Sequence, residues 1–475
     1  MLRNFRIGPA TNSSSSHSVI VHPARGGRDA LAQVREALPP DGTAERTMPG
    51  PLVDGSFVLA DPTDRALYLL SGSRMKSLSA HERLEVEKAV AARCDRARLA
   101  ALMEEDRAES LLEYSADGYL DTMRAQGVSP GLAARFFLSD DVTVYGYDDA
   151  DPPLRLTRAG IAASRDGITR YRQDGDALIG YDPERGTKFR WSESPYEKAS
   201  APELVDVKIT DYCAYGCAFC YQGSTKQGVH APLARLKAIF DQLAAMGVFE
   251  VAMGGGEPCH HPDFEAILEA GWARGLTMNF TAFGLDWTKS PVLTRARRRK
   301  PGAAVPPVGV GVSVHGPRDL AKLRRAEAKR FDGISTVLAQ TVIGATPFED
   351  IEETLEAAMD NGLPLLLLGY KPTGRGVDFG RLDVDRDRLA RLIARAQDFV
   401  AREDNGFHLS VDTAFLDDYG DVLDECGIWS ALRSGPEGAF SMYVDAVTDR
   451  CGPSSYCDAQ DMPPIGDLTA QFAAY

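Results

Sequence analysis

Three cysteines follow directly after a strand-like run, and their spacing constrains this chain more than any other feature. They are Cys213, Cys217 and Cys220, in a C-x3-C-x2-C pattern. Three thiolates at this spacing can wrap a short loop around one iron–sulfur cube, which normally takes four cysteine ligands. A cube held by three cysteines leaves one iron without a protein ligand. Because an open coordination position is where metal chemistry occurs, the pattern indicates a reactive centre.

Structural zinc is the main alternative for this triplet. Zinc knuckles favour paired C-x2-C units with a fourth Cys or His nearby. The next candidate ligands are His230, Cys259 and His260, and none stands at zinc-finger spacing. The spacing therefore favours an iron–sulfur cluster over zinc or a chance grouping.

The pattern from Leu204 onward predicts an α/β fold with a parallel sheet, because short β-rich runs alternate with helix-period runs. We expect strands near residues 204–210, 249–253, 276–281, 308–314, 335–343 and 363–368. The cysteine loop follows the first of these strands. The cluster should therefore lie beyond the carboxyl end of a parallel strand, where such folds keep their sites. About six βα units are too few for a closed eight-fold barrel.

The triplet, the aromatic Phe219 before its last cysteine, and the run Gly-Gly-Gly-Glu-Pro at 254–258 together resemble the radical S-adenosylmethionine (radical SAM) superfamily. The resemblance covers roughly residues 204–376. It implies a partial (βα)6 barrel of the radical SAM type, open on one side where a bulky substrate can enter. It also implies a [4Fe-4S] cluster on the three cysteines and S-adenosyl-L-methionine (SAM) chelated to the open iron. In that family reductive cleavage of SAM gives a 5′-deoxyadenosyl radical, which takes a hydrogen atom from the substrate.

The same resemblance implies which residues bind the methionine ammonium of SAM. Gly255, Gly256 and Glu257 match the family's Gly-Gly-Glu run, which hydrogen-bonds that ammonium. Glycines also let a backbone approach a ligand closely. A plain strand-to-helix turn is the alternative explanation of this run.

Polar residues at other strand ends are further candidates. Ser313 and His315 end the fourth strand, where the family's polar residues contact the SAM ribose or carboxylate, or face the substrate. Arg375 follows the sixth strand, where a basic residue of the family often meets the SAM carboxylate. Its planar guanidinium group can bind a carboxylate through two hydrogen bonds and therefore suits it better than the ammonium group of nearby Lys371. Asn279 and Thr281 share one face of the third strand. Ordinary hydrogen bonds or ion pairs at the top of the barrel are the alternatives.

The C-terminal part holds Cys426, Cys451 and Cys457 and resembles a SPASM or twitch extension, which binds an auxiliary iron–sulfur cluster in some radical SAM enzymes. Cys426 is followed by eleven residues, Gly438 and four more residues, but then Tyr443 stands where a cysteine is expected. One standard ligand is therefore missing. Three interpretations stay open: an auxiliary cluster with an open or non-cysteine ligand, a zinc site, or free buried thiols.

Residues 1–200 lie outside the resemblance. We expect an α+β accessory domain of unknown role, with a hairpin over residues 56–71 and a β-meander that ends near residue 191. The expected division is 1–200 for this domain, 201–400 for the partial barrel and 401–475 for the cysteine-bearing extension.

Composition limits the partners of this chain. The net charge of −15 argues against nucleic acid, which usually needs a basic surface, although residues 295–300 form a short basic run that we interpret as a solvated loop. No apolar stretch is long enough to span a membrane, and no signal peptide is evident at the start. Eight cysteines among 475 residues are no disulfide scaffold, so a reducing cytoplasm is expected.

These observations together predict a radical SAM enzyme that abstracts hydrogen from a peptide or natural-product substrate. Because such clusters work at low potential, a flavodoxin or ferredoxin is the expected electron donor. The alternatives are an RNA-modifying radical SAM enzyme and a non-catalytic metal-binding scaffold.

Overall fold

The computed structural model divides the chain into two compact units. The first comprises Met1–Arg3, Ala24–Asp182 and Lys188–Tyr196, and the second comprises Asn4–Pro23, Pro183–Thr187 and Glu197–Tyr475. The residues that the structure describes are 2–6, 19–20, 56–59, 62–70, 77–94, 119–139, 142–147, 154–156, 170–183, 186–293, 308–330, 336–400, 402, 405–427 and 435–475.

The first unit mixes helices with two small sheets. One sheet has the order β3-β4-β5 and the other the order β1-β8-β7-β6. Inside this unit the ring of Phe136 stacks on that of Phe189 with centroids 5.2 Å apart. The elements are β1 (Leu2–Arg6), β3 (Ser56–Leu59), α2 (Pro62–Leu70), α3 (Ala80–Arg93), α6 (Tyr119–Ala125), α7 (Pro130–Phe137), β4 (Val142–Tyr147), β5 (Leu154–Leu156), β6 (Arg170–Asp174), β7 (Ala177–Asp182) and β8 (Thr187–Ser192).

The hairpin expected over residues 56–71 is wrong. Only its first half is a strand, and α2 begins at Pro62. Proline is favoured in the first turn of a helix because its missing N–H would have no partner there. Pro62 therefore starts a helix where the turn of the hairpin was expected.

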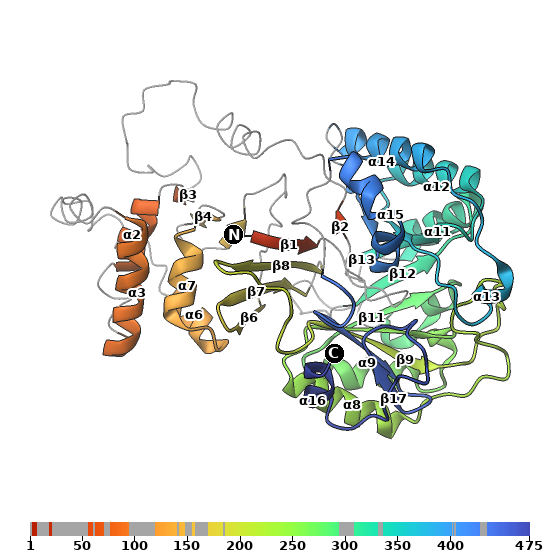
Figure 1. Ribbon diagram of the computed structural model, residues 1–475, viewed down its shortest axis with the longest axis horizontal. Helices are drawn as coiled ribbons and strands as arrows, with labels where there is room; N and C mark the ends of the chain where they lie inside the picture. The colour runs from red at the N-terminus through yellow and green to blue at the C-terminus, as the bar shows by residue number, and fades with distance from the viewer. Residues whose placement is uncertain are drawn as a thin grey trace. The chain divides into compact units, whose positions relative to one another are not determined.

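The second unit is built on one sheet of ten strands, in the order β17-β16-β9-β10-β11-β12-β13-β14-β15-β2 (Figure 1). From β16 to β15 all neighbours are parallel, and the two edge strands are antiparallel. The strands are β2 (Val19–Ile20), β9 (Leu204–Thr210), β10 (Glu250–Gly255), β11 (Thr277–Ala282), β12 (Gly309–Ser313), β13 (Thr336–Val342), β14 (Leu365–Leu368), β15 (Leu409–Val411), β16 (Ser441–Asp445) and β17 (Arg450–Gly452).

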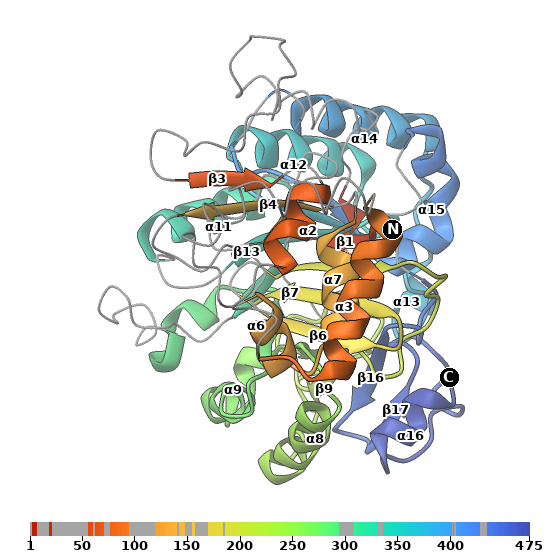
Figure 2. The same ribbon diagram turned by 90° about the vertical axis from the view of Figure 1, so that its left-hand side faces the viewer.

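Helices connect these strands and cover the outside of the sheet, with α11, α12 and α14 neighbouring one another and α8 lying beside α9 (Figures 1 and 2). In α8 the side chains of Leu236, Phe240 and Leu243 are buried and form the apolar stripe of this helix. The helices are α8 (Leu233–Ala245), α9 (Phe264–Trp272), α11 (Pro317–Arg330), α12 (Phe348–Asp360), α13 (Gly376–Phe379), α14 (Arg386–Val400), α15 (Thr413–Glu425) and α16 (Leu468–Ala473), with 3-10 turns η1 (Pro258–His260) and η2 (Asp286–Lys289).

The six expected strands are confirmed as β9 to β14, and the α/β class with a parallel sheet is confirmed with them. The sheet continues beyond these six strands. β15 follows β14 in parallel, and β16 pairs in parallel with β9 on the other side. Residues 435–475 therefore pack into the same compact unit as the parallel strands.

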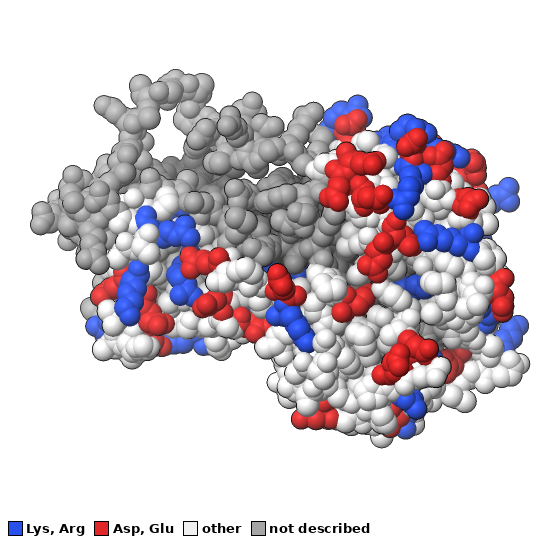
Figure 3. Space-filling view, viewed as in Figure 1, with Lys and Arg blue, Asp and Glu red and all other residues white. Residues whose placement is uncertain are grey.

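Charged side chains of both signs mix over α12 and α14 on the face shown in Figure 3. Arg388 bridges Glu349 at 2.9 Å and Glu352 at 2.6 Å, and Arg395 pairs with Glu356. The described residues on this face thus form no continuous basic surface. The basic run at 295–300 lies outside the described residues. Among the helices that the structure describes, none has the length and apolar character needed to cross a membrane.

Candidate active site

The cysteine loop connects β9 to α8 and is stabilised by hydrogen bonds between its own backbone groups. The amide of Asp211 donates to the carbonyl of Val229 at 2.8 Å, and that of Cys213 donates to the carbonyl of Thr225 at 2.9 Å. The Thr210 hydroxyl also receives the amide of Tyr212 at 2.9 Å. These bonds tie both ends of the loop together at the carboxyl end of β9, where the sequence predicted the site.

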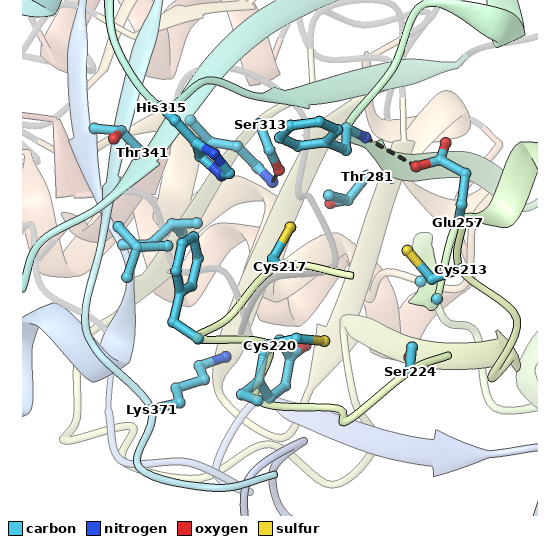
Figure 4. Close-up of a pocket in the computed structure, with 18 of the residues that line it drawn as sticks. Cys213, Cys217, Cys220, Ser224, Glu257, Thr281, Ser313, His315, Thr341 and Lys371 are labelled. Carbon is cyan, nitrogen blue, oxygen red and sulfur yellow. Dashed lines mark hydrogen bonds between the residues drawn. The ribbon is translucent and has the colours of Figure 1, made fainter. Parts of the chain in front are cut away.

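All three loop cysteines line one cavity, and their sulfur atoms point toward its middle (Figure 4). The empty space, open mouth included, is about 970 Å³. The cavity is lined by Cys213, Cys217, Phe219, Cys220, Tyr221, Ser224, Gly254, Gly255, Gly256, Glu257, Thr281, Phe283, Ser313, Val314, His315, Gln340, Thr341, Val342, Leu368, Gly369, Tyr370 and Lys371.

The glycines after β10 allow its end to pack tightly against β9 and the cysteine loop. Gly255 has a φ of +105°, and a Cβ there would lie 2.3 Å from the carbonyl oxygen of Thr210. At Gly256 a Cβ would lie 2.0 Å from the carbonyl oxygen of Tyr212. Any larger residue would push the two segments apart, so both glycines are needed to bring Glu257 next to the cysteines.

Glu257 is buried, with 3% of its surface exposed, and it lies beside Cys213 in the cavity (Figure 4). Its Oε2 accepts the backbone N–H of Phe283 at 3.0 Å. Burial raises the pKa of this carboxyl to about 7, against the smaller opposing effect of the Phe283 hydrogen bond. A buried carboxylate at the cavity wall is suited to receive a cationic group of a ligand.

We predict that an ammonium ligand at Glu257 binds more tightly as the pH rises. Below the raised pKa the carboxyl holds a proton that the ligand must displace, so affinity should rise up to about tenfold per pH unit between about pH 5.5 and 7. Titration calorimetry with SAM, whose methionine part carries such an ammonium, measures this slope in the cluster-loaded protein. Glu257→Gln should bind more weakly with a flat profile below pH 7, and an equally steep profile in that variant would refute the assignment.

Ser313 and His315 both line the cavity from the end of β12. The amide of Gln340 donates to Ser313 Oγ at 3.2 Å. The ring of His315 lies between those of Phe219 and Phe283, at 5.2 and 4.8 Å. Burial lowers the pKa of His315, which favours a neutral imidazole at neutral pH.

The third-strand candidates separate in the structure. Thr281 lines the cavity, whereas Asn279 is buried away from it. The Asn279 side chain donates to Glu250 at 3.0 Å and accepts the amide of Gly309 at 2.8 Å. Asn279 thus connects neighbouring strands.

Arg375 is not among the residues that line the cavity, unlike its neighbour Lys371. Its Nε donates to the carbonyl of Cys217 at 2.9 Å, and its Nη1 donates to the carbonyl of Ser224 at 2.8 Å. Its backbone amide also bonds the carbonyl of Cys220 at 3.0 Å. The structure therefore places Arg375 as a clamp on the cysteine loop.

Replacing Arg375 with alanine is expected to loosen the cysteine loop and reduce cluster loading. Hydrogen bonds from a charged donor contribute about 1.5–3 kcal/mol each, and two side-chain bonds would be lost. Iron per chain after anaerobic reconstitution and gel filtration measures the effect. Arg318→Ala, on the exposed surface of α11, is the control. Full iron content in Arg375→Ala would contradict the clamp.

The cavity wall contains residues that strand-end patterns did not single out. Phe283 comes just after β11 and fixes Glu257 through its backbone, which no side-chain pattern reveals. Gln340 and Thr341 lie inside β13 near its carboxyl end. These residues could have been found by examining the carboxyl end of every parallel strand, and not only the ends that carry conspicuous polar residues.

The three C-terminal cysteines make separate hydrogen bonds in the structure, and an auxiliary cluster that uses them stays a prediction. The thiol of Cys426, at the end of α15, donates to the carbonyl of Ala390 at 3.5 Å. Cys451 lies on β17 and accepts the hydroxyl of Tyr475 at 3.4 Å. Cys457 donates to the carbonyl of Ser454 at 3.0 Å. Tyr443, at the place of the missing cysteine, is buried on β16 beside Asp206.

The loop cysteines fit a cube better than a single metal ion. Within the part of the chain that the structure describes, no three His, Cys, Asp or Glu side chains converge as they would on one ion. Each cysteine of a cube binds a different iron, so its sulfurs surround a space instead of meeting at a point. Three free thiols around one cavity fit this requirement, with room on the remaining side for a ligand.

Comparison with known proteins agrees with this geometry. The Radical SAM superfamily matches residues 207–373, which include the end of β9, the cysteine loop and the glycine run. The chain carries a radical SAM domain. Such domains work with a [4Fe-4S] cluster and SAM, which are therefore the cofactors of this one.

Curated relatives of the chain include a maturase and a peptide cyclase by name. The mycofactocin maturase MftC of Mycobacterium tuberculosis is 27% identical over 267 residues, which cover 52% of this chain and 63% of MftC. The PqqA peptide cyclase of Ruegeria pomeroyi is 29% identical over 101 residues, or 20% of this chain and 26% of the cyclase. The chain thus spans less than two thirds of the length of these relatives.

Among solved structures, Streptococcus suis SuiB bound to the precursor peptide SuiA is similar, with a TM-score of 0.44 and 17% identity. The alignment covers 58% of this chain and 66% of SuiB.

Proposed function

We propose that this protein is a radical SAM enzyme that cleaves SAM reductively and abstracts hydrogen from a peptide. The observation that carries the proposal is that Cys213, Cys217, Cys220 and Glu257 all face one cavity. When bound there, the [4Fe-4S] cluster and SAM supply a 5′-deoxyadenosyl radical.

The chain's own residues would bind and orient the cofactors. The thiolates of Cys213, Cys217 and Cys220 hold the cluster, and Arg375 keeps their loop in place. Gly255 and Gly256 allow the approach that brings Glu257 beside Cys213, where its carboxylate accepts the methionine ammonium of SAM. Ser313, oriented by Gln340, donates to the ribose or carboxylate of SAM.

His315 packs between Phe219 and Phe283 and gives the cavity an aromatic wall. A flat ring such as adenine can stack on such a wall. These half-buried rings also limit water near a radical, which protects it from side reactions.

The peptide substrate is supported by the names of two relatives, a maturase and a peptide cyclase. A flavodoxin or ferredoxin would supply the electron, because the cluster must be reduced at low potential. Reduction of the cluster at low potential suits a reducing cytoplasm.

Anaerobic incubation of the reconstituted protein with dithionite and SAM tests the proposal. We expect 5′-deoxyadenosine and methionine, detected by liquid chromatography and mass spectrometry. The triple variant with Cys213, Cys217 and Cys220 replaced by alanine should release neither. A wild-type protein with a full complement of about four iron atoms per chain that releases neither product would refute the proposal.

A further inference from the structure

Lys371 lines the cavity just after β14, with 5% of its surface exposed. Its Nζ lies 4.5 Å from the ring centroid of Tyr221 and 4.9 Å from that of Tyr456. It also donates to Ser455 Oγ at 3.4 Å. Two aromatic faces and a hydroxyl thus fix the ammonium at the cavity wall.

Lys371 and Glu257 lie on opposite walls. Glu257 follows β10 and Lys371 follows β14, with β11, β12 and β13 between them in the sheet. Neighbouring strands are about 4.8 Å apart, so four steps separate the two walls. In Figure 4 Glu257 lies beside Cys213, whereas Lys371 lies beyond Cys220 on the other side of the cysteines.

This separation decides which ligand Lys371 meets. The ammonium and carboxylate of methionine are carried on the same carbon atom. A SAM molecule whose ammonium is at Glu257 therefore cannot place its carboxylate at Lys371. The ammonium of Lys371 faces whatever occupies the other half of the cavity.

The charges around Lys371 limit the chemistry of that occupant. Asp206, Asp412 and Glu437 act on its ammonium electrostatically. The Asp412 carboxylate is fixed by the amides of Gly369 and Phe415, each at 2.8 Å. Burial raises the pKa of Asp206 and Glu437, so Asp412 is the acid whose charge offsets that of Lys371, and a further carboxylate placed beside it would be repelled. A neutral oxygen acceptor fits without repulsion.

The chain outside the radical SAM domain holds this wall in place. Ser455 and Tyr456 follow β17, well beyond residue 373. The Tyr456 hydroxyl bonds the carboxylates of Asp417 and Glu437, each at 3.3 Å. Both residues position Lys371, so the C-terminal segment shapes the cavity wall that faces away from Glu257.

We propose that the Lys371 ammonium donates a hydrogen bond to a neutral carbonyl oxygen of the substrate, on the wall opposite the SAM ammonium site. This inference rests on the proposed function, since it assigns one wall of the same cavity to SAM and the other to a peptide.

The first test measures SAM affinity in the full-length, cluster-loaded protein by equilibrium dialysis. Lys371→Met should bind SAM within about twofold of the wild type, whereas Glu257→Gln on the opposite wall should bind at least about tenfold more weakly. Lys237→Met, on the exposed surface of α8, is the control. A tenfold loss in Lys371→Met would assign Lys371 to SAM and overturn the inference.

The second test uses a size-filtered peptide extract of the source cells as the probe. Wild-type protein with SAM and dithionite should change the mass of a peptide, and Lys371→Met should give less than a tenth of that product. Equal yields would overturn the inference. If the wild type changes no peptide, the proposed peptide substrate fails, while the SAM measurement still decides the role of Lys371.

A variant that keeps the positive charge serves as a control for misfolding of Lys371→Met, because removing a buried cation leaves the negative charge of Asp412 uncompensated. Lys371→Arg retains the charge but changes the shape and reach of the donor. It should fold, bind SAM as the wild type does, and lose at least about tenfold in peptide product. Unchanged product in this variant would count against a positioned hydrogen bond.

Discussion

Replacement of Cys217 by alanine is expected to lower the release of 5′-deoxyadenosine from SAM by about 10³-fold or more. Cys217 is the middle ligand of the loop in sequence, and its sulfur points into the same cavity as those of Cys213 and Cys220 (Figure 4). Two cysteines alone do not hold a cube that normally has four. Iron content and the amount of product formed under dithionite measure the effect together.

Cys426→Ala is the matched control for this prediction. Its thiol bonds the carbonyl of Ala390 on α14, away from the loop cysteines. We expect it to retain both iron and SAM cleavage. Loss of iron in Cys426→Ala, or retention of both iron and activity in Cys217→Ala, would contradict the assignment of the ligands.

Replacement of Asp412 by alanine is expected to destabilise the second unit by about 3–5 kcal/mol, the cost of breaking a buried charge pair. Asp412 has none of its surface exposed and begins α15 as its N-cap. Its Oδ1 accepts two amides, and its charge compensates that of Lys371. Loss of the cap alone costs about 1 kcal/mol.

Urea unfolding followed by circular dichroism measures this loss of stability. Asp412→Asn keeps an oxygen acceptor but not the charge, so its loss should lie between those of the wild type and alanine. Glu353→Ala, exposed on α12, should stay within about 0.5 kcal/mol of the wild type. A loss below about 1 kcal/mol in Asp412→Ala would show that neither the cap nor the charge pair matters.

The positions of the parallel strands could be predicted because each is a short apolar run followed by a helical pattern. The cysteine loop and the glycine run could be placed at strand ends for the same reason, and the structure brings them to one cavity. β16 escaped prediction because its pairing with β9 joins residues that are more than 230 positions apart. No local pattern reports such a pairing.

The choice between Arg375 and Lys371 shows where sequence reasoning ends. Both residues follow β14 within a few positions, and the planar guanidinium group of Arg375 favoured it as the residue that binds the SAM carboxylate. The structure instead turns Arg375 toward the carbonyls of the cysteine loop and leaves Lys371 on the cavity wall. The direction of each side chain depends on the turn after the strand, which its sequence alone does not specify.

The C-terminal cysteines illustrate the same limit. Their order resembled a cluster-binding extension, but spacing along a chain does not fix distance in space. Cys426 ends a helix against α14, whereas Cys451 belongs to an edge strand beside β16.

The most direct test of the central claim asks whether SAM binds the cluster through its methionine part. Electron–nuclear double resonance on the dithionite-reduced protein, with SAM labelled with nitrogen-15 at its amino group, detects coupling between that nitrogen and the cluster. We predict a clear nitrogen coupling in the wild type and its loss in the triple cysteine variant. A fully metallated wild-type protein that shows no such coupling would contradict an open iron on Cys213, Cys217 and Cys220.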